Sequence, residues 1–340
     1  MHSHNGQPKV SVCVVSYNHE KYIEECLASI VSQETDFNFE IIVGDDRSTD
    51  NTRAIISTFY NSHPNVIKPV FHSRHVGPTK NYLSVHSAAK GQYIAHIDGD
   101  DLMLPGKLQI QADNLDKNPE CSICFHKVKR YDQETKKYLK EARRKIPRKS
   151  EISYLLMNAG LFSHSSKMYR SRCREDLELI AEEVIDNYMH FHHAAKGKIL
   201  FLNQVLGVYR VNIGIGIDKS DQRNTIYKRP AAEMIKRNLD SLEYARRCGV
   251  SSNYIKKAKA NYYFRTSYNY LMANDYENFK IYISKSMEIE RLNNSQYIFF
   301  LCSKTSSLHH SLYYLLKLRA RTRHIPSIFF EKYLSHKLWL

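Results

Sequence analysis

Three carboxylates stand within four residues of the sequence, directly after an apolar run that predicts a buried strand. They are Asp98, Asp100 and Asp101, and the run is Tyr93–Ile97. Carboxylates so closely spaced repel one another unless a cation or an array of donors neutralises them. A hard divalent cation, Mg²⁺ or Mn²⁺, suits such a site because it binds a few carboxylates together with substrate phosphate oxygens. Gly99 lets the backbone approach closely. An exposed acidic turn is the alternative interpretation.

Two further acidic clusters lie where helices are predicted to begin. Asp45 and Asp46 follow a second predicted strand, and Asp50 and its neighbours can cap the helix that comes next. Capping does not require two more carboxylates at the strand end, where parallel sheets bind ligands, so a mixed role is expected. Glu183 and Asp186 belong to the third cluster, where Asp186 opens a helix and interacts favourably with its dipole.

Apolar periodicity predicts the elements that position these clusters. Strand and helix patterns alternate over the first hundred residues, which indicates a parallel α/β sheet. Beyond residue 224 the strand signal vanishes, so a boundary near residue 220 divides the chain into 1–220 and 221–340. The predicted strands are 10–16, 40–44, 66–71, 93–97, 123–131 and 198–211, and the predicted helices are 20–32, 50–60, 79–89, 107–118, 180–195, 231–248, 253–273, 276–291 and 307–318.

Three segments, taken in order, resemble family 2 glycosyltransferases. They are Val-Ser-Val-Cys-Val-Val-Ser-Tyr17-Asn18, then Glu-Ile-Ile-Val-Gly-Asp45-Asp46 with Ser-Thr-Asp, then Tyr-Ile-Ala-His-Ile-Asp98-Gly-Asp100-Asp101 with Pro105 and Lys107-Leu108. The resemblance spans roughly residues 9–215, and no single short motif carries it. It implies the α/β GT-A fold, here with a C-terminal α-helical extension, and a nucleotide-diphospho-sugar as donor.

The resemblance also implies roles for the matching positions. Tyr17 and its neighbours would pack on the base, Asp45 or Asp46 would hydrogen-bond its edge, and Asp100 with Asp98 would hold Mn²⁺ or Mg²⁺. Such a cation would stabilise the diphosphate as it leaves. The implied nucleotide-sugar site comprises Ser16, Tyr17, Asn18, Asp45, Asp46, Lys80, Asp98, Gly99 and Arg210.

A catalytic base and an acceptor pocket follow from the same resemblance. An acidic residue that opens a helix before a Lys-Gly turn and a Val-Tyr-Arg strand is the family's base, which here is Asp186, with Glu183 as the second candidate. It would take the acceptor's hydroxyl proton and give inversion. His164 and Ser165 lie where related enzymes shape the acceptor pocket. Asn212 departs from the pattern, because related sequences have His there.

The implied reaction moves one sugar, most readily from a UDP-sugar, to a glycan or lipid-linked glycan in surface-polysaccharide synthesis. The Gln-x-x-Arg-Trp motif of processive polymerases is absent, which favours a single addition. A nucleotidyltransferase of similar fold is the alternative enzyme. That alternative predicts a Gly-rich phosphate loop after the first strand, and Ser16–Glu20 is not one.

Composition bounds these interpretations. The 340 residues are 42% hydrophobic and carry a net charge of +15, so a disordered chain is excluded and an anionic partner is expected. No run of about 18 apolar residues occurs, which excludes a spanning helix, and the polar N-terminus lacks a secretory signal. Seven scattered Cys are not a disulfide framework. We expect a cytoplasmic protein, with the inner face of the plasma membrane as the surface that it could contact.

The C-terminal region is basic and rich in Tyr. Helices with aromatics on one face and cations on the other commonly lie on anionic membranes, and the segments 297–302 and 328–330 would add apolar wedges. The equal alternative is a small bundle whose Tyr residues form the core. A non-catalytic module that binds single-stranded nucleic acid is the rival from another class, but no recognised motif supports it, so no nucleic acid is expected.

Two groups of residues of metal-binding types are interpreted as packed side chains and not as metal sites. Cys121 and Cys124 have zinc-ligand spacing, but no second pair follows them at finger spacing. His190 and His193 share one face of a predicted helix without a third ligand. We therefore expect buried thiols and packed imidazoles at these positions.

Overall fold

The computed structural model describes residues 7–139, 145–158, 161–174, 186–211, 213 and 231–321. The chain divides into two compact units, residues 1–215 and 216–340. We call them the first and the second unit and describe each by itself.

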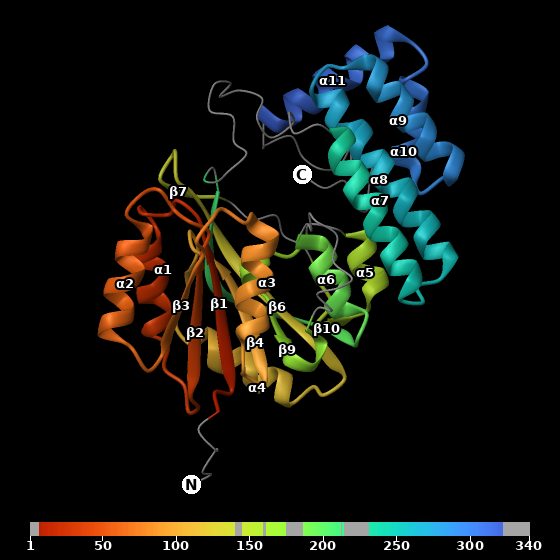
Figure 1. The fold of residues 1–340 in the computed structure, drawn as a ribbon. Coiled ribbons are helices and arrows are strands. Elements are labelled where there is room, and N and C mark those ends of the chain that lie inside the picture. Colours follow the sequence, from red (N-terminus) through yellow and green to blue (C-terminus); the bar gives the residue numbers. More distant parts are fainter. Residues whose placement is uncertain are drawn as a thin grey trace. The chain divides into compact units, whose positions relative to one another are not determined.

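The first unit is built on one mixed sheet with the strand order β3-β2-β1-β4-β9-β6-β10-β5 (Figure 1). The first four strands along the chain are mutually parallel, and β6 is parallel to β10. Short β9 runs antiparallel between β4 and β6. The strands are β1 Val10–Ser16, β2 Phe39–Asp45, β3 Ile67–Phe71, β4 Tyr93–Asp98, β5 Leu102–Met103, β6 Cys121–Asp132, β7 Lys137–Tyr138, β8 Lys149–Ser150, β9 Met168–Arg170 and β10 Lys198–Val211.

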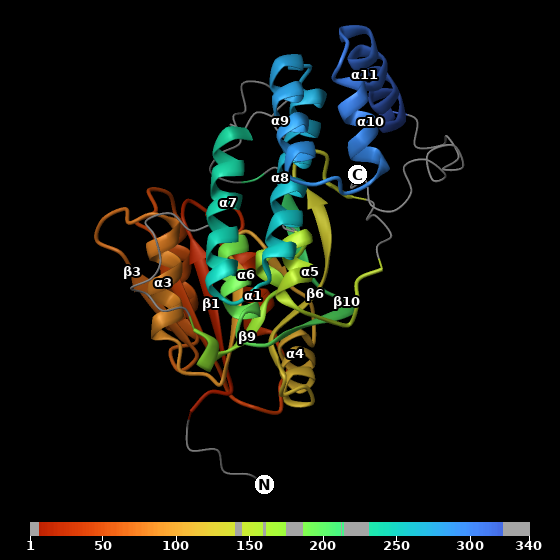
Figure 2. The same cartoon turned by 90° about the vertical axis from the view of Figure 1, so that its right-hand side faces the viewer.

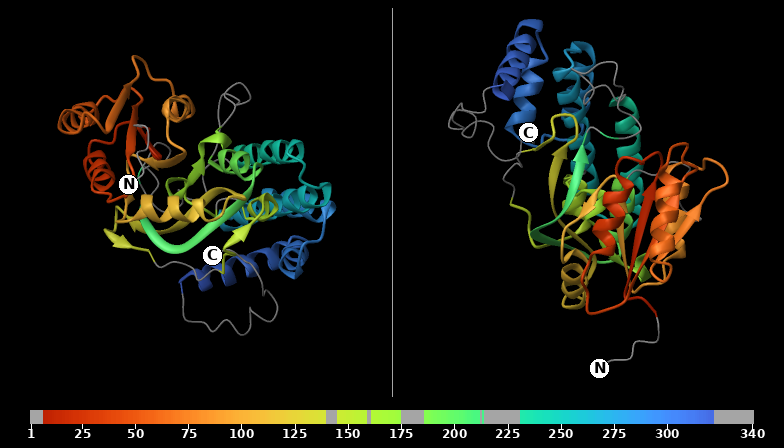
Figure 3. Two further views of the ribbon diagram at one scale, coloured as in Figure 1. Left: turned by 90° about the horizontal axis from the view of Figure 1, so that it is seen from below. Right: turned by 90° about the vertical axis from the view of Figure 1, so that its left-hand side faces the viewer.

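Helices cover both faces of the parallel part of the sheet (Figure 3). Val12 belongs to the same buried cluster as Leu27 of α1, whereas Cys13 Sγ lies 3.3 Å from the Val85 carbonyl of α3. Successive strand residues point to opposite faces, so α1 and α3 must lie on different sides. The helices are α1 Ile23–Val31, α2 Thr52–Ser62, α3 Pro78–Ala88, α4 Lys107–Asp116, α5 Ile152–Met157 and α6 Asp186–Ala194, with 3₁₀ turns η1 His164–Ser166 and η2 Ser171–Cys173.

This arrangement is the GT-A-like α/β fold that the sequence predicts. The continuous apolar runs become strands buried on both faces, as expected for a parallel sheet. Pro69 lies in β3 at the edge of the sheet, where a missing backbone donor is tolerated. Strand β9 and helix α5 were not predicted, because elements of three and six residues are too short to show a period.

The second unit is helical over its described residues. Its helices are α7 Ala231–Arg247, α8 Ser252–Met272, α9 Tyr276–Ile289, α10 Asn294–Cys302 and α11 Ser306–Arg321. Figure 2 shows α7 and α8 side by side and α10 beside α11. Their core is formed by Phe264, Leu271, Phe279, Ile283, Phe299, Leu312 and Leu316. Helix α10 was missed as an element because its sequence, NSQYIFFLC, is apolar almost all round.

No helix within the described residues combines the length and the apolar character that crossing a membrane requires.

Candidate functional site

The carboxyl ends of β1, β2 and β4 meet at one edge of the sheet. The register pairs Ser16 with Asp45 and Val15 with Asp98, so the polar residues that follow these strands lie side by side. Asn81, buried in α3, donates its amide to the Ser16 and Gly44 carbonyls, at 3.3 and 3.1 Å. Asn81 was not predicted as a site residue, because nothing in its local sequence pattern marks a side chain that links two strands.

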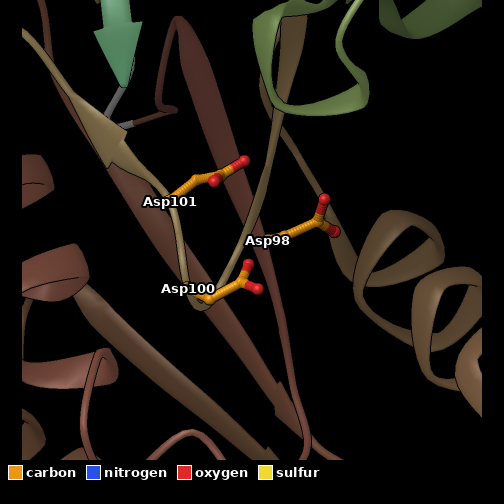
Figure 4. Close-up of side chains that lie close together, drawn as sticks. All are labelled: Asp98, Asp100 and Asp101. Carbon is orange, nitrogen blue, oxygen red and sulfur yellow. The ribbon is translucent and has the colours of Figure 1, made fainter. Parts of the chain in front are cut away.

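The acidic cluster lies in the tight turn that joins β4 to β5. Ligand oxygens of Asp98, Asp100 and Asp101 lie within 4.8 Å of one another, and their carboxylates turn toward the same side (Figure 4). Gly99 packs so closely under the turn that a Cβ atom there would lie 2.9 Å from His19 Nδ1. Close approach is therefore the reason for glycine at this position.

Burial and mutual repulsion act on all three carboxylates. Burial, opposed in part by nearby His19, raises the pKa of Asp98. Burial and the charge of Asp98 raise the pKa of Asp100 to about 7. Burial and the charges of Asp100 and Asp98 raise the pKa of Asp101 well above its usual range, and among the described residues its Oδ2 has no hydrogen-bond partner. A site with excess negative charge and hard oxygen donors fits a divalent cation.

Asp98 is held by Ser165, which is distant in the sequence, and by His96 of its own strand. The Ser165 hydroxyl lies 3.2 Å from Asp98 Oδ2 and accepts the Asp98 backbone N–H at 3.1 Å, and His96 Nε2 lies 3.1 Å from Asp98 Oδ1. Lys107 donates to the Ser165 carbonyl at 2.7 Å, and its burial lowers its pKa to about 7. His164 and Ser165, predicted for the acceptor pocket, are thus buried with Ser165 directed at the acidic turn.

Arg210 braces the other end of the acidic turn. Strand β10 pairs with β5 in antiparallel register, Val208 opposite Leu102, which brings Arg210 to the turn. The Arg210 backbone N–H donates to Asp101 Oδ1 at 2.8 Å, and its guanidinium donates to the Asp100 carbonyl at 2.6 Å and pairs with Glu25. The predicted contact of Arg210 with the nucleotide-sugar stays a prediction, and in the structure its donors bind the turn and Glu25.

The two carboxylates after β2 are engaged by protein donors. Asp45 is completely buried and accepts from Ser48 and from the Arg53 guanidinium. Asp46 accepts the backbone N–H groups of Val76 and Gly77, at 2.6 and 2.9 Å. These bonds fix the loop before α3. A carboxylate oxygen has two lone pairs, and both oxygens of Asp45 already have two contacts each, whereas Asp46 Oδ1 accepts one bond and keeps a lone pair.

An aromatic and polar rim adjoins these carboxylates. The Tyr17 ring lies beside the His75 ring with centroids 4.7 Å apart. Exposed Asn18, at φ 54°, accepts the Thr49 backbone N–H at 2.8 Å. Lys80 is exposed in the first turn of α3. Tyr17, Asn18 and Lys80 therefore lie on segments that surround the ends of β1 and β2.

The predicted base falls at the limit of the described residues. Asp186 begins the described part of α6, but its side chain and residues 175–185 are outside the described residues, so its place at the start of the helix stays a prediction. Glu183 and Asn212 also lie outside them. The roles of these three residues remain predictions.

The Cys and His groups interpreted as packing are buried. Cys121 and Cys124 are free thiols inside the sheet. His190 Nε2 lies 3.2 Å from His164 Nδ1, and His193 is completely buried. Within the part of the chain that the structure describes, the acidic cluster alone brings three metal-ligating side chains together.

Sequence comparison shows what this chain is similar to. Residues 11–177 match the model described as Glycosyl transferase family 2. An uncharacterized protein of Mycobacterium tuberculosis, Rv1520, is 33% identical over 202 residues, which are 59% of this chain and 58% of that protein. The chain thus spans little more than half the length of that relative. Abequosyltransferase RfbV of Salmonella typhimurium is 28% identical over 53% of this chain and 58% of its own length.

Solved structures share the fold at low sequence identity. Staphylococcus aureus TarS in complex with UDP-GlcNAc superposes with a TM-score of 0.60 at 17% identity, covering 93% of this chain and 92% of that one. A Pyrobaculum calidifontis mannosyltransferase in complex with GDP-Man and Mn²⁺ gives a TM-score of 0.57 at 16% identity, covering 96% and 84%. Residues 11–177 are thus similar to Glycosyl transferase family 2, and the solved structures share the GT-A-like fold that carries the acidic turn at the end of β4.

Proposed function

We propose that this protein is an inverting glycosyltransferase that moves one sugar from a nucleotide-diphospho-sugar to a hydroxyl of a glycan or glycolipid acceptor. One observation carries the proposal: the acidic turn Asp98–Asp101 lies at the sheet edge that Tyr17, Asp45 and Asp46 also line. Donor complexes of the structural neighbours TarS and the Pyrobaculum mannosyltransferase support a nucleotide-sugar. A UDP-sugar is our first choice.

Each part of the site would have a distinct task. Tyr17 would stack on the base, and Asp46, held by two backbone donors, would accept from the base edge. Asp100 and Asp98 would hold Mn²⁺ or Mg²⁺, which when bound would neutralise the diphosphate as it leaves. Asp101 Oδ2 has no hydrogen-bond partner among the described residues, and the pKa of Asp100 is raised. Both observations indicate that ionised carboxylates are unfavourable at this turn unless a cation neutralises them.

Asp186 is proposed as the general base. A first-turn carboxylate at the start of α6 would remove the acceptor's hydroxyl proton while that oxygen attacks the anomeric carbon. The bond to the diphosphate breaks on the opposite side, which gives inversion. The Ser165 hydroxyl is directed at Asp98 rather than at solvent. We therefore propose that His164 and Ser165 shape the acceptor side through the backbone of their segment and do not contact the acceptor directly.

A donor screen with a base-deficient variant tests this proposal. Purified protein with MnCl₂ would be incubated with UDP-, GDP-, dTDP- and CMP-sugars, and nucleotide release and thermal shift would be followed. We expect one donor to stabilise the protein in a metal-dependent manner and to release nucleoside diphosphate. Asp186→Asn should retain that stabilisation while slowing transfer by about 10²–10⁴-fold, the usual contribution of a general base.

The outcomes separate the alternatives. Pyrophosphate release from a nucleoside triphosphate and a sugar phosphate would favour the nucleotidyltransferase. No stabilisation by any donor, with or without Mn²⁺, would contradict the glycosyltransferase proposal. Asp36→Asn is a matched control, because Asp36 is exposed in a loop away from the acidic turn.

The second unit offers a surface that suits an anionic membrane. Helix α11 exposes about half of the side chains of Leu308, Leu315 and Leu318 along one face. Neither α10 nor α11 contains an acidic residue. Lys304 is exposed and Lys317 is half-buried, and each lies over an aromatic ring. We propose that this face of α11 lies in the headgroup region of an anionic bilayer, near a lipid-linked acceptor.

Vesicle binding tests the membrane proposal. The protein should sediment with vesicles that contain phosphatidylglycerol and not with pure phosphatidylcholine, and salt should weaken the binding. Leu315→Asp with Leu318→Asp should lower partitioning by more than tenfold, because each half-exposed leucine can transfer about half of the roughly 2 kcal/mol that full burial contributes. Leu139→Asp, an exposed leucine of the first unit, is the control. Salt-dependent binding to RNA in place of vesicles would contradict the proposal.

A further inference from the structure

A chain of three hydrogen bonds leads from Asp98 into the core of the first unit. Asp98 Oδ1 lies 3.1 Å from His96 Nε2, and His96 Nδ1 lies 3.0 Å from His86 Nε2. His86 Nδ1 lies 2.7 Å from the Tyr169 hydroxyl. The chain thereby connects β4, α3 and β9, and we call His96, His86 and Tyr169 the relay.

The relay is shielded from water. His96 and Tyr169 are completely buried, and His86 is 1% exposed. The Tyr82 ring stacks on His86 with centroids 3.8 Å apart, and the His193 ring lies 3.7 Å from the Tyr169 ring. Buried polar groups destabilise a fold unless they are hydrogen-bonded, so this network is strongly constrained to one arrangement.

The chemistry of the groups links them into one network. An ionised Asp98 can only accept, so His96 must donate from Nε2. The 3.0 Å contact between His96 Nδ1 and His86 Nε2 pairs one donor nitrogen with one acceptor nitrogen, and the Tyr169 hydroxyl can serve His86 Nδ1 in either role. Each bond therefore restrains the ring orientation of the next group.

We propose that His96, oriented by His86 and Tyr169, is a positioning residue that holds the Asp98 carboxylate in one orientation, in which it would bind a divalent cation. His96 restrains Oδ1 and Ser165 restrains Oδ2, at 3.1 and 3.2 Å, so the carboxylate cannot rotate freely. Partners of metal ligands typically contribute 10–100-fold to metal affinity. This inference rests on the cation site of the proposed function.

The test measures Mn²⁺ binding directly, from the electron paramagnetic resonance of free Mn²⁺ with and without UDP. His96→Leu should weaken Mn²⁺ binding by about 10–100-fold, whereas His96→Gln, whose amide can still donate to Asp98, should lose less. Tyr169→Phe removes one hydroxyl and keeps the ring, and it should weaken Mn²⁺ binding by a few fold. In the His96→Gln background, where the relay is cut, Tyr169→Phe should have no further effect.

The non-additive effects of Tyr169→Phe and His96→Gln on Mn²⁺ affinity distinguish a positioning role from a general loss of stability, and a second buried tyrosine serves as the control. Tyr93→Phe is the matched control, because Tyr93 is a completely buried tyrosine at the other end of β4 whose hydroxyl donates to Asp116. It should lower the melting temperature and leave Mn²⁺ affinity unchanged. The donor KM should rise with the Mn²⁺ dissociation constant in relay variants.

Two outcomes would overturn the inference. One is an equal effect of Tyr169→Phe with His96 and with Gln at position 96, since independent sites add and coupled sites do not. The other is unchanged Mn²⁺ affinity in a folded His96→Leu protein. If the unaltered protein binds no Mn²⁺, the cation site of the proposed function fails as well, and that result is distinct from a loss of coupling alone.

Discussion

Replacing Asp100 with Asn is expected to abolish the stabilisation by Mn²⁺ and to slow sugar transfer by about 10²–10³-fold, the scale found when one transition-state contact is removed. The same substitution should raise the melting temperature of the metal-free protein. A change that stabilises the fold while removing activity is the signature of a strained functional site.

The physical reason is charge repulsion within the turn. Oxygens of three carboxylates lie within 4.8 Å of one another, and Arg210 donates to the Asp100 backbone carbonyl rather than to its carboxylate. Burial and Asp98 raise the pKa of Asp100 to about 7, so ionising it in the folded protein is unfavourable. Asn is nearly isosteric and uncharged. We expect a gain of about 1–2 kcal/mol, at about 1.4 kcal/mol per pKa unit and less than the full shift because Asp100 is partly exposed.

Differential scanning fluorimetry with EDTA and with MnCl₂ measures both effects, and a coupled nucleotide-release assay measures transfer. Asp36→Asn, which also removes one negative charge from the first unit, should change neither the melting temperature nor its response to Mn²⁺. Retention of the Mn²⁺ response by Asp100→Asn would show that Asp100 is not a ligand of the cation.

Much of this site could be predicted because its position follows from the ends of strands. The apolar runs of β1, β2 and β4 are continuous, and β1 begins and ends at the predicted residues. Once those strands are placed in a parallel sheet, the residues that follow them must meet at one edge. The sequence pattern alone therefore located Asp45, Asp46 and Asp98 at this edge. The strand register shows that the ends of their strands lie side by side.

The contacts that hold the site could not be predicted in the same way. Ser165 lies 67 positions after Asp98 in the sequence and contacts it from the 3₁₀ turn η1. No periodicity in the sequence predicts this turn. Glu25 pairs with Arg210 across 185 positions. His96 has the alternation of a strand residue that faces the core, and its bond to His86 depends on how α3 packs. Tertiary packing decides such contacts, and a single sequence carries no record of it.

Replacing Arg210 with Ala is the second substitution for which a large effect is expected. We expect the free energy of unfolding to fall by about 2–4 kcal/mol and Mn²⁺ binding to weaken together with it. The estimate lies below the usual 3–5 kcal/mol for breaking a buried pair, because Glu25 is 65% exposed and can return to water.

The Arg210 guanidinium makes three contacts at and beside the turn. It donates to the Asp100 carbonyl, pairs with Glu25 and packs over the Tyr22 ring at 5.4 Å, while its own side chain is only 7% exposed. Its positive charge also lowers the pKa of Asp100 against the effect of burial. Ala would remove the packing, the donors and the charge at once, leaving three carboxylates without a nearby cationic side chain from β10.

Chemical denaturation with EDTA present measures the stability effect separately from the cation. Arg210→Lys keeps the charge but cannot make the forked contacts, so it should recover part of the stability and less of the Mn²⁺ affinity. Arg246→Ala is the matched control, because Arg246 also pairs with a glutamate, Glu243, but is 61% exposed, and such pairs contribute about 0–1 kcal/mol. If Arg210→Ala were as mild as Arg246→Ala, Arg210 would not brace the turn. Its predicted contact with the nucleotide-sugar would then be the better explanation for a buried arginine beside the acidic turn.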